Sequence, residues 1–495
     1  MRLRSALRSA ASIGAALLLL AALAALVILD PRVVLVTPPK THADADVTLP
    51  PSDVSLVCLP GPISPEQEAS GDEEFGHHSA ATRSSLSVSS LPRGDKAAAP
   101  ATYVRSLSGQ SFPLEGTPTG ILDADAGGEL GLLQASADAT SRPALVGSEI
   151  TLTGGGDLRG LSAHSCSEPS ENAWLVGGST RIGARTDLVI VNPGATNAEV
   201  QVDLYSEQGY LEDLSGTTLA VAAKGSQTLS LATLVPDAER LVVHVRASGA
   251  RVLSALRLSE LDGITPLGTG LVTAGAGPAS DLTVSGVRAS KEAPASLRLL
   301  NVTEASVQAS VQILSDEDPH DLPGAEDLTL DAGAVTDVSL EGIEEGSAAV
   351  RVEANGPLVV GAVTSIAGQE GARSTTWLPS DSVARTLYVP LTFELGVTSR
   401  LQLTAGERTS EIGVRFVSAG GDLGQAEEMT LAAHTTRLLT VPKDSRAAII
   451  EGTEPVGAIA QLTATGEGGE LGAVLPAAPD SEERRTLEIQ IGPYG

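Results

Sequence analysis

Residues 187–206 read Asp-Leu-Val-Ile-Val-Asn-Pro-Gly-Ala-Thr-Asn-Ala-Glu-Val-Gln-Val-Asp-Leu-Tyr-Ser. Two apolar runs rich in β-branched residues flank a turn that contains Pro, Gly and Asn. Such runs favour extended backbone, and the turn residues favour a reversal of the chain. The stretch therefore predicts a strand, a short connection and a second strand.

The same pattern returns at residues 296–315 and 399–418, and the three stretches align without gaps. The first strand of each ends at Asn192, Asn301 and Thr404. Equivalent apolar pairs in the second strand are Val202 and Leu204, Val311 and Ile313, and Val414 and Phe416. Alternation along a strand places both members of each pair on one face, which we expect to be buried.

The repeat extends well beyond this hairpin and sets the size of the unit. Leu219, Leu328 and Met429 are equivalent, and their positions differ by 109 and then 101 residues. This length, with roughly seven or eight strands, is typical of an immunoglobulin-like β-sandwich. A doubled β-propeller blade would also fit the length, but no half-period echo is visible inside a unit. We therefore predict three tandem sandwich repeats, at 174–273, 281–379 and 385–476.

Composition agrees with an all-β chain of several domains. The 495 residues are 42% hydrophobic and 2% aromatic, with 52 Gly and 29 Pro that interrupt many short Val and Leu runs. The net charge of −29 argues against a nucleic-acid surface, which needs clustered Lys and Arg. It also disfavours adhesion of the main body to anionic lipid.

The N-terminus predicts a membrane anchor. A basic tail at 1–9 precedes an apolar run at 10–29, long enough for a helix that crosses a bilayer. The arginines of the tail favour a cytoplasmic N-terminus, so the bulk of the chain is expected outside the cell membrane. A cleaved signal peptide is the alternative, and its only good site, Ala43-Asp44-Ala45, lies far downstream.

Two segments outside the repeats carry further expectations. Short alternating runs between Pro- and Gly-rich turns predict one irregular β domain at 33–170. Cys58 and Cys166, the two cysteines of the chain, fit a single disulfide outside the cytosol, and two unpaired buried thiols are the alternative. The tail at 477–495 includes Thr486–Ile491, which alternates as a spare edge strand would, and a frayed tail is the alternative.

No catalytic, cofactor or metal residues are predicted. The sequence lacks a Gly-x-Ser-x-Gly elbow, and its seven histidines are scattered. His77-His78, the acidic run at 316–321 and the Gly-rich stretch at 154–157 are each better interpreted as solvated loops or turns. The triplet Asn301-Val302-Thr303 is a glycosylation sequon, which is common by chance.

Several motifs together resemble a known family. They are the apolar N-terminal run, Leu56–Pro62 (Leu-Val-Cys-Leu-Pro-Gly-Pro), Arg159-Gly160-Leu161, Trp174–Thr180 (Trp-Leu-Val-Gly-Gly-Ser-Thr) and Leu188–Pro193. The chain resembles an uncharacterised family of actinobacterial membrane-anchored envelope proteins, over nearly its whole length. The resemblance implies location and architecture but no catalytic residue. It also suggests, by analogy, a role near envelope polysaccharide assembly.

We therefore expect a non-catalytic, membrane-anchored extracytoplasmic scaffold or interaction protein of the cell envelope. The alternative is a protein that binds a carbohydrate or wall polymer through an exposed aromatic residue. Its candidates are Tyr205, Tyr210, Trp377 and Tyr388. A third hypothesis is an enzyme with an unfamiliar site at 33–170. The expected partners are the membrane, through the N-terminal helix, and an envelope protein or polysaccharide.

Overall fold

The computed structural model describes residues 44–48, 50–62, 75, 78, 80–94, 96–212, 214, 217–293, 295–480 and 486–490. The predicted basic tail and membrane helix lie outside these residues. None of the helices within them is long and apolar enough to cross a membrane. The chain divides into two compact units, one of residues 50–485 and one that joins 1–49 to 486–495.

In the smaller unit, β1 (Asp44–Thr48) pairs antiparallel with β35 (Thr486–Gln490). The predicted strand near the C-terminus is therefore present, and its partner is a strand from the other end of the chain.

The larger unit is built from four copies of one strand series. The N-terminal copy comprises β2 (Val54–Cys58), β3 (Thr82–Leu91), β4 (Ala101–Arg105), β5 (Ser111–Pro113), β6 (Gly120–Ala124), β7 (Gly131–Ala135), β8 (Ala144–Thr153) and β9 (Gly160–Ser165). Repeat 1 comprises β10 (Asn172–Val176), β11 (Ala184–Asn192), β12 (Ala198–Ser206), β13 (Gly209–Tyr210), β14 (Thr218–Val221), β15 (Gly225–Ser230), β16 (Leu241–Ser248), β17 (Leu253–Asp262) and β18 (Thr265–Val272).

Repeats 2 and 3 follow the same course. Repeat 2 comprises β19 (Ala279–Ala289), β20 (Ser296–Asn301), β21 (Val307–Leu314), β22 (His320–Asp321), β23 (Leu328–Leu330), β24 (Val335–Ser339), β25 (Gly346–Ala367) and β26 (Arg373–Pro379). Repeat 3 comprises β27 (Ala384–Pro390), β28 (Thr398–Ala405), β29 (Ser410–Ser418), β30 (Glu427–Leu431), β31 (Thr436–Thr440), β32 (Ser445–Gly466), β33 (Gly469–Pro476) and β34 (Ala478–Pro479). Three short 3-10 helices are Leu231–Thr233 (η3), Gln369–Gly371 (η4) and Glu394–Gly396 (η5).

Each copy makes two antiparallel sheets whose strands interleave along the chain. In repeat 1 the first sheet has the order β10-β16-β12, followed by β13 and β14, and the second has the order β15-β11-β17-β18. The N-terminal copy gives the matching orders β2-β7-β4-β5 and β6-β3-β8-β9. In repeats 2 and 3 one long strand, β25 or β32, belongs to both sheets and joins them into an eight-stranded sheet.

Within each copy the two sheets share a buried core. In repeat 1, Leu175 and Val202 of the first sheet pack with Leu188, Ile190 and Leu256 of the second. The pairs predicted to be buried, Val202 and Leu204 and their equivalents, are indeed in these cores. The expectation of an all-β chain is confirmed.

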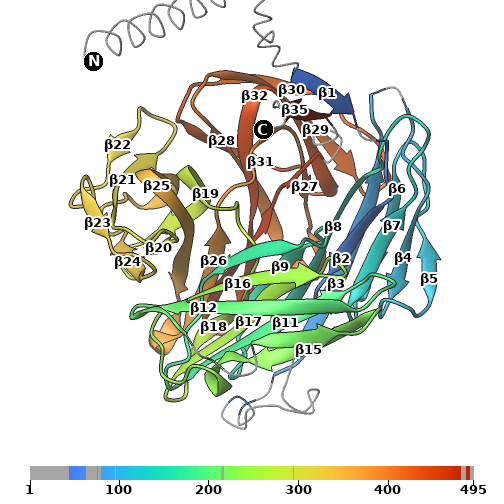
Figure 1. The fold of residues 1–495 in the computed structure, drawn as a ribbon. Helices are drawn as coiled ribbons and strands as arrows, with labels where there is room; N and C mark the ends of the chain where they lie inside the picture. Colours follow the sequence, from blue (N-terminus) through green and yellow to red (C-terminus); the bar gives the residue numbers. More distant parts are fainter. Residues whose placement is uncertain are drawn as a thin grey trace, which may run out of the picture. The chain divides into compact units, whose positions relative to one another are not determined.

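Parts of the faces turned away from these cores are also buried, against neighbouring copies. Val57 and Leu132 of the N-terminal copy pack on Val191 and Ala255 of repeat 1. Val176 and Val242 of repeat 1 pack on Leu300 and Val359 of repeat 2. Ile459 of repeat 3 joins the core of repeat 2, and Val146 of the N-terminal copy packs on Ile449 of repeat 3. These contacts close a propeller-like ring of the described sheets (Figure 1).

This arrangement corrects two expectations. The repeats are not three separate immunoglobulin-like sandwiches, because apolar side chains outside each copy's core pack on neighbouring copies. The segment at 33–170 is not irregular over its described strands, because residues 54–165 repeat the strand order of the other copies.

One strand of each copy, namely β9, β18, β26 and β33, lies at the centre of the ring. Ser165 Oγ in β9 donates to the Pro476 carbonyl in β33 at 2.7 Å, and Thr376 Oγ1 in β26 donates to the Gly472 carbonyl at 2.9 Å. Thr375 Oγ1 donates to the Leu267 carbonyl in β18 at 2.8 Å. A Cβ added at Gly160 in β9 would lie 2.5 Å from Thr269 Oγ1 in β18. Small residues and hydroxyls therefore let these four strands approach one another closely.

Candidate functional site

Aromatic side chains, scarce elsewhere, gather on the first sheet of repeat 1. The sequence has 2 Trp and 5 Tyr. Of these, Trp174 in β10, Tyr205 in β12 and Tyr210 in β13 lie together with His244 in β16, and we call this group the aromatic platform. The Trp174 and His244 rings stack 3.8 Å apart between centroids, with an angle of 4° between their planes. The ring centroid of Tyr205 lies 5.8 Å from that of Trp174 and 5.1 Å from that of Tyr210.

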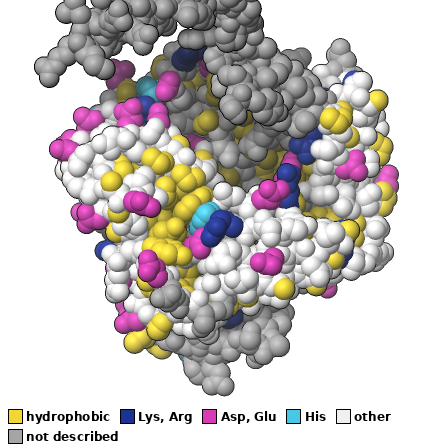
Figure 2. Space-filling model, viewed as in Figure 1, with side chains coloured by type: hydrophobic (Ala, Val, Ile, Leu, Met, Phe, Trp, Pro, Cys, Tyr) yellow, Lys and Arg dark blue, Asp and Glu magenta, His cyan; other side chains and the backbone are white. Residues whose placement is uncertain are grey.

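The platform runs from a buried end to an exposed end. Trp174 is 7% exposed and packs at the seam with the second sheet of repeat 2, whereas Tyr210 is 47% exposed. The turn of repeat 2 at Gly333 borders the exposed end, because a Cβ there would lie 3.8 Å from Tyr210 Cβ. On the face shown in Figure 2, hydrophobic side chains gather beside a histidine and a basic side chain, where β16, β20 and β24 lie in Figure 1.

Polar groups fix the platform along one side. The Asp203 carboxylate accepts from Arg246, 2.8 Å from Nη2, and lies 3.4 Å from His244 Nδ1. His244 Nε2 donates to Asn172 Oδ1 at 2.6 Å. Burial lowers the pKa of His244 more than Asp203 raises it. Burial and the Asp203 charge both raise the pKa of Tyr205 and Tyr210, so their hydroxyls remain protonated donors.

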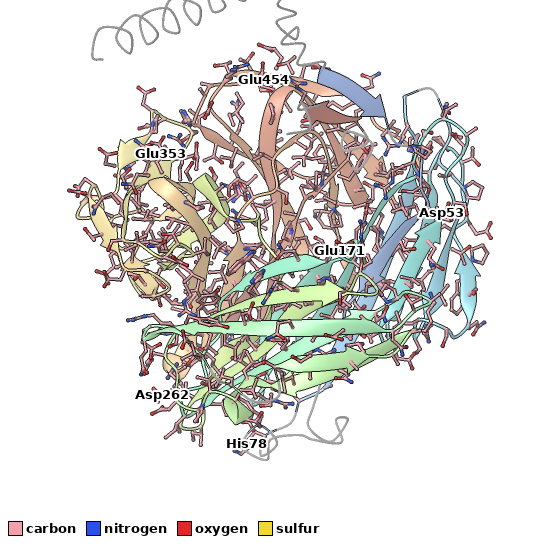
Figure 3. All side chains as sticks on the ribbon, in the orientation of Figure 1. Asp53, His78, Glu171, Asp262, Glu353 and Glu454 are labelled. Atoms are coloured by element: carbon pink, nitrogen blue, oxygen red, sulfur yellow. A yellow bond between two sulfur atoms is a disulfide. The ribbon has the colours of Figure 1, made fainter. Side chains whose placement is uncertain are left out.

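Repeat 2 shows that the fold does not require aromatic residues at this place. Trp174 pairs across the strands with His244, and at the same register Thr283 pairs with Arg351. Arg351 forms a bidentate pair with Asp281 and also binds Glu353, which is labelled in Figure 3. An ion-pair group therefore replaces the aromatic platform without changing the strands.

The other two residues predicted as candidates for carbohydrate contact, Tyr388 and Trp377, are both buried. Tyr388 is 5% exposed, and its hydroxyl donates to Asp480 at 3.2 Å. Trp377 is 8% exposed and lines a separate pocket of about 240 Å³. Sequence reasoning named Tyr205 and Tyr210 but could not place them beside Trp174 and His244.

A larger groove of about 780 Å³ lies between the N-terminal copy and repeat 3. Arg83, Asp123, Asp125 and Glu394 line it together with several hydroxyl groups. Arg446 binds both Asp123, at 2.7 Å, and Glu394, at 2.8 Å. Two of the groove's carboxylates therefore have a structural partner already.

A buried ionisable pair lies in the core of the N-terminal copy. Glu149 in β8 is paired across the strands with His164 in β9, and both are 1% exposed. Neither carboxylate oxygen of Glu149 has a hydrogen-bond partner among the described residues. Burial raises the pKa of Glu149 well above its usual value and lowers the pKa of His164 to about 4. Leu59 N–H donates to His164 Nδ1 at 3.3 Å, which holds the Cys58–Pro62 segment over this pair.

The predicted disulfide is confirmed. Cys58 and Cys166 are bonded, with an S–S distance of 2.02 Å, and join β2 to the end of β9. Other sequence candidates stay apart: His77 lies outside the described residues, and His78 (Figure 3) donates its N–H to Asp157 Oδ2 at 2.8 Å. In the part of the chain that the structure describes, no three metal-ligating side chains converge. Asn301 of the sequon is fully buried.

Residues 122–442 match a family described as a family of unknown function, DUF5719. No curated protein matches the chain in sequence. A solved Ca²⁺-stabilised adhesin that helps an Antarctic bacterium bind ice is 13% identical, with 86% of this chain and 99% of that chain covered, at a TM-score of 0.11. An α-L-rhamnosidase of Streptomyces avermitilis, solved with L-rhamnose, is 9% identical, with 86% and 57% covered, at a TM-score of 0.13.

Proposed function

Because the chain belongs to the DUF5719 family, whose function is unknown, we propose a role from its own surface. The protein is a non-catalytic, membrane-anchored extracytoplasmic scaffold of the cell envelope, and it binds a wall polysaccharide at the aromatic platform. The single observation that carries this proposal is the exposed Tyr210, backed by Tyr205, Trp174 and the Asp203–Arg246 pair.

The chemistry of the platform suits a sugar. Aromatic faces offer a flat apolar surface for the C–H face of a sugar ring, while the tyrosine hydroxyls, Asp203 and Arg246 offer hydrogen bonds at its edge. Tyr210 lies at the exposed end of the platform, where it can contact one stretch of a long chain without enclosing the chain's ends. This geometry favours a polymer over a small metabolite.

The compartment has independent support. The Cys58–Cys166 disulfide fits an oxidising environment outside the cytosol. The charge of −29 keeps the ring soluble and apart from anionic lipid, so contact with a polymer is the role that its surface suits better.

The test is retention of the full-length protein, purified in detergent, on insoluble cell-wall polysaccharide. The double variant Tyr205→Ala and Tyr210→Ala should weaken binding by roughly fivefold or more, since an aromatic contact is worth about 1 kcal/mol. The matched control is Ile264→Ala, which removes an 82% exposed apolar side chain from the same repeat. Failure of the unaltered protein to bind, or equal retention of the double variant, would refute the proposal.

A further inference from the structure

A second site lies on the same seam between repeats 1 and 2. It is a pocket of about 240 Å³ whose lining includes Arg181, Arg298 and Arg373. Trp377, Glu239 and Glu260 also line it. We call it the arginine pocket. We propose that it binds an anionic group, a phosphate or a carboxylate, carried by the polymer that the platform binds.

One arginine is fixed as a wall of the pocket. The Arg298 guanidinium forms a bidentate pair with Asp337, at 2.8 and 2.9 Å, and its Nη1 donates to the Gly178 carbonyl at 2.6 Å. It also lies over the Trp377 ring, 4.9 Å from the centroid. These contacts hold the positive charge in place before a ligand arrives, so binding loses little side-chain entropy.

The other two arginines are free to turn to a ligand. Arg181 Nη2 lies 3.8 Å from Glu260, which is the limit of an ion pair. The Arg373 guanidinium has no hydrogen-bond partner among the described residues, although its main-chain carbonyl accepts from Arg159 at 3.0 Å. Guanidinium groups bind phosphate and carboxylate through paired N–H donors, so both are suited to an anion.

The acidic residues of the pocket offset only part of this charge, because Asp337 pairs with Arg298 and Glu260 lies near Arg181, whereas Arg373 has no ion-pair partner among the described residues. Burial raises the pKa of Glu260, although Arg181 and Arg298 oppose that shift. Glu239 is exposed at the rim. In a chain of net charge −29, a pocket with three arginines is the local feature that lets an acidic polymer approach.

Binding at the two sites can be measured separately by tryptophan fluorescence, because the only tryptophans of the chain are Trp174 and Trp377. In the Trp174→Phe variant, fluorescence comes from Trp377 and reports on the arginine pocket. In the Trp377→Phe variant, it comes from Trp174 and reports on the aromatic platform. The probes are inorganic phosphate, D-glucuronate and, as the neutral sugar, D-glucose, added to the full-length protein.

The expected result is a saturable change in the fluorescence of the Trp174→Phe protein when phosphate or glucuronate is added. Glucose should give no such change. Adding Arg181→Ala and Arg373→Ala should weaken that binding by about tenfold, because two charge-assisted donors are lost. The control Arg408→Ala removes an arginine with a 74% exposed side chain in repeat 3 and should change nothing. A phosphate response identifies a phosphate-bearing polymer, and a glucuronate response identifies a uronic acid polymer.

The proposal is overturned if neither anion gives a saturable change. It is also overturned if the double arginine variant binds as well as its parent, or if Arg408→Ala weakens binding equally. This inference deepens the proposed function, yet the two fail separately. Loss of retention on wall polysaccharide with the arginine response intact would refute the platform alone, and the reverse would refute the pocket alone.

Discussion

At the residue scale, the repeated asparagine is a structural residue. Asn192 is fully buried, and its Nδ2 donates to the carbonyls of Thr196 and Val221, at 2.8 and 3.1 Å. Asn301 makes the same pair of bonds four and 29 residues further on, to Ala305 and Leu330. The sequence identified both residues as strand ends, but it could not show that one side chain ties the turn to a distant strand.

Replacement of Asn192 by Ala should therefore destabilise the protein by about 2–4 kcal/mol, since one buried and one partly buried carbonyl lose their donor. The free energy of unfolding in urea measures the effect. A matched change at Asn197, whose Oδ1 accepts from Ala223 N–H in an exposed loop, should cost less. Equal losses for the two variants would contradict the structural role of Asn192.

Glu149 and His164 are residues that the strand pattern alone could not single out, since it predicts a strand and not a buried charge. Their counterparts at the same register in repeat 1, Leu256 and Val272, are apolar. The N-terminal copy therefore contains an ionisable pair where the fold needs only packing. A buried carboxylate without partners destabilises a protein, so Glu149→Leu should stabilise the chain by about 1–4 kcal/mol at pH 8.

The dependence on pH separates the two groups. His164 has its pKa lowered to about 4, so its stabilising contribution is present above pH 6.5 and is lost as the pH falls toward 4, by about 3 kcal/mol. Glu149 has a raised pKa, so its contribution is present below pH 4.5 and is lost as the pH rises. The free energy of unfolding of the His164→Leu variant, measured from pH 7 to 4, should not show the loss that His164 causes. A pH profile equal to that of the unaltered protein would contradict the assignment.

At the element scale, strand order explains what the sequence could and could not predict. The sequence predicts β11–β12, β20–β21 and β28–β29 as consecutive strands, yet the two strands of each do not pair with each other. β11 and β12 belong to different sheets, and the other two pairs meet only through the long strands β25 and β32. Neighbours in a sheet, such as β12 and β16, lie far apart in the chain and pair only through tertiary contacts. Local patterns therefore predicted the strands well and the sheets poorly.

The disulfide acts at this scale because it joins the two sheets of the N-terminal copy. Cys58 and Cys166 are 108 residues apart, and closing a loop of that length is worth about 4–5 kcal/mol in the chain-entropy model. Reduction, or the double variant Cys58→Ser and Cys166→Ser, should lower the free energy of unfolding by a corresponding amount. The urea midpoint should fall with it. An unchanged midpoint under reducing conditions would show that packing alone holds β2 in place.

At the scale of the whole molecule, closure of the ring makes the four copies interdependent. Each seam buries apolar side chains from two copies, as Val176 and Leu300 do between repeats 1 and 2. Thermal unfolding of the folded ring should therefore follow one cooperative transition, because loss of one copy exposes two apolar faces. Several separate transitions in calorimetry would indicate independent sandwiches instead.

The ring also explains how one copy can carry function while its relatives do not. Similar sheets supply the scaffold, and repeat 1 alone places Trp174, Tyr205, Tyr210 and His244 together among the described residues. The most direct test is hydrogen exchange of the full-length protein with and without soluble wall polysaccharide. The polymer should slow exchange in β12, β13 and the turn at Gly333, and leave the equivalent β21 and β22 of repeat 2 unchanged. Protection that is absent from repeat 1, or equal in both repeats, would contradict the account.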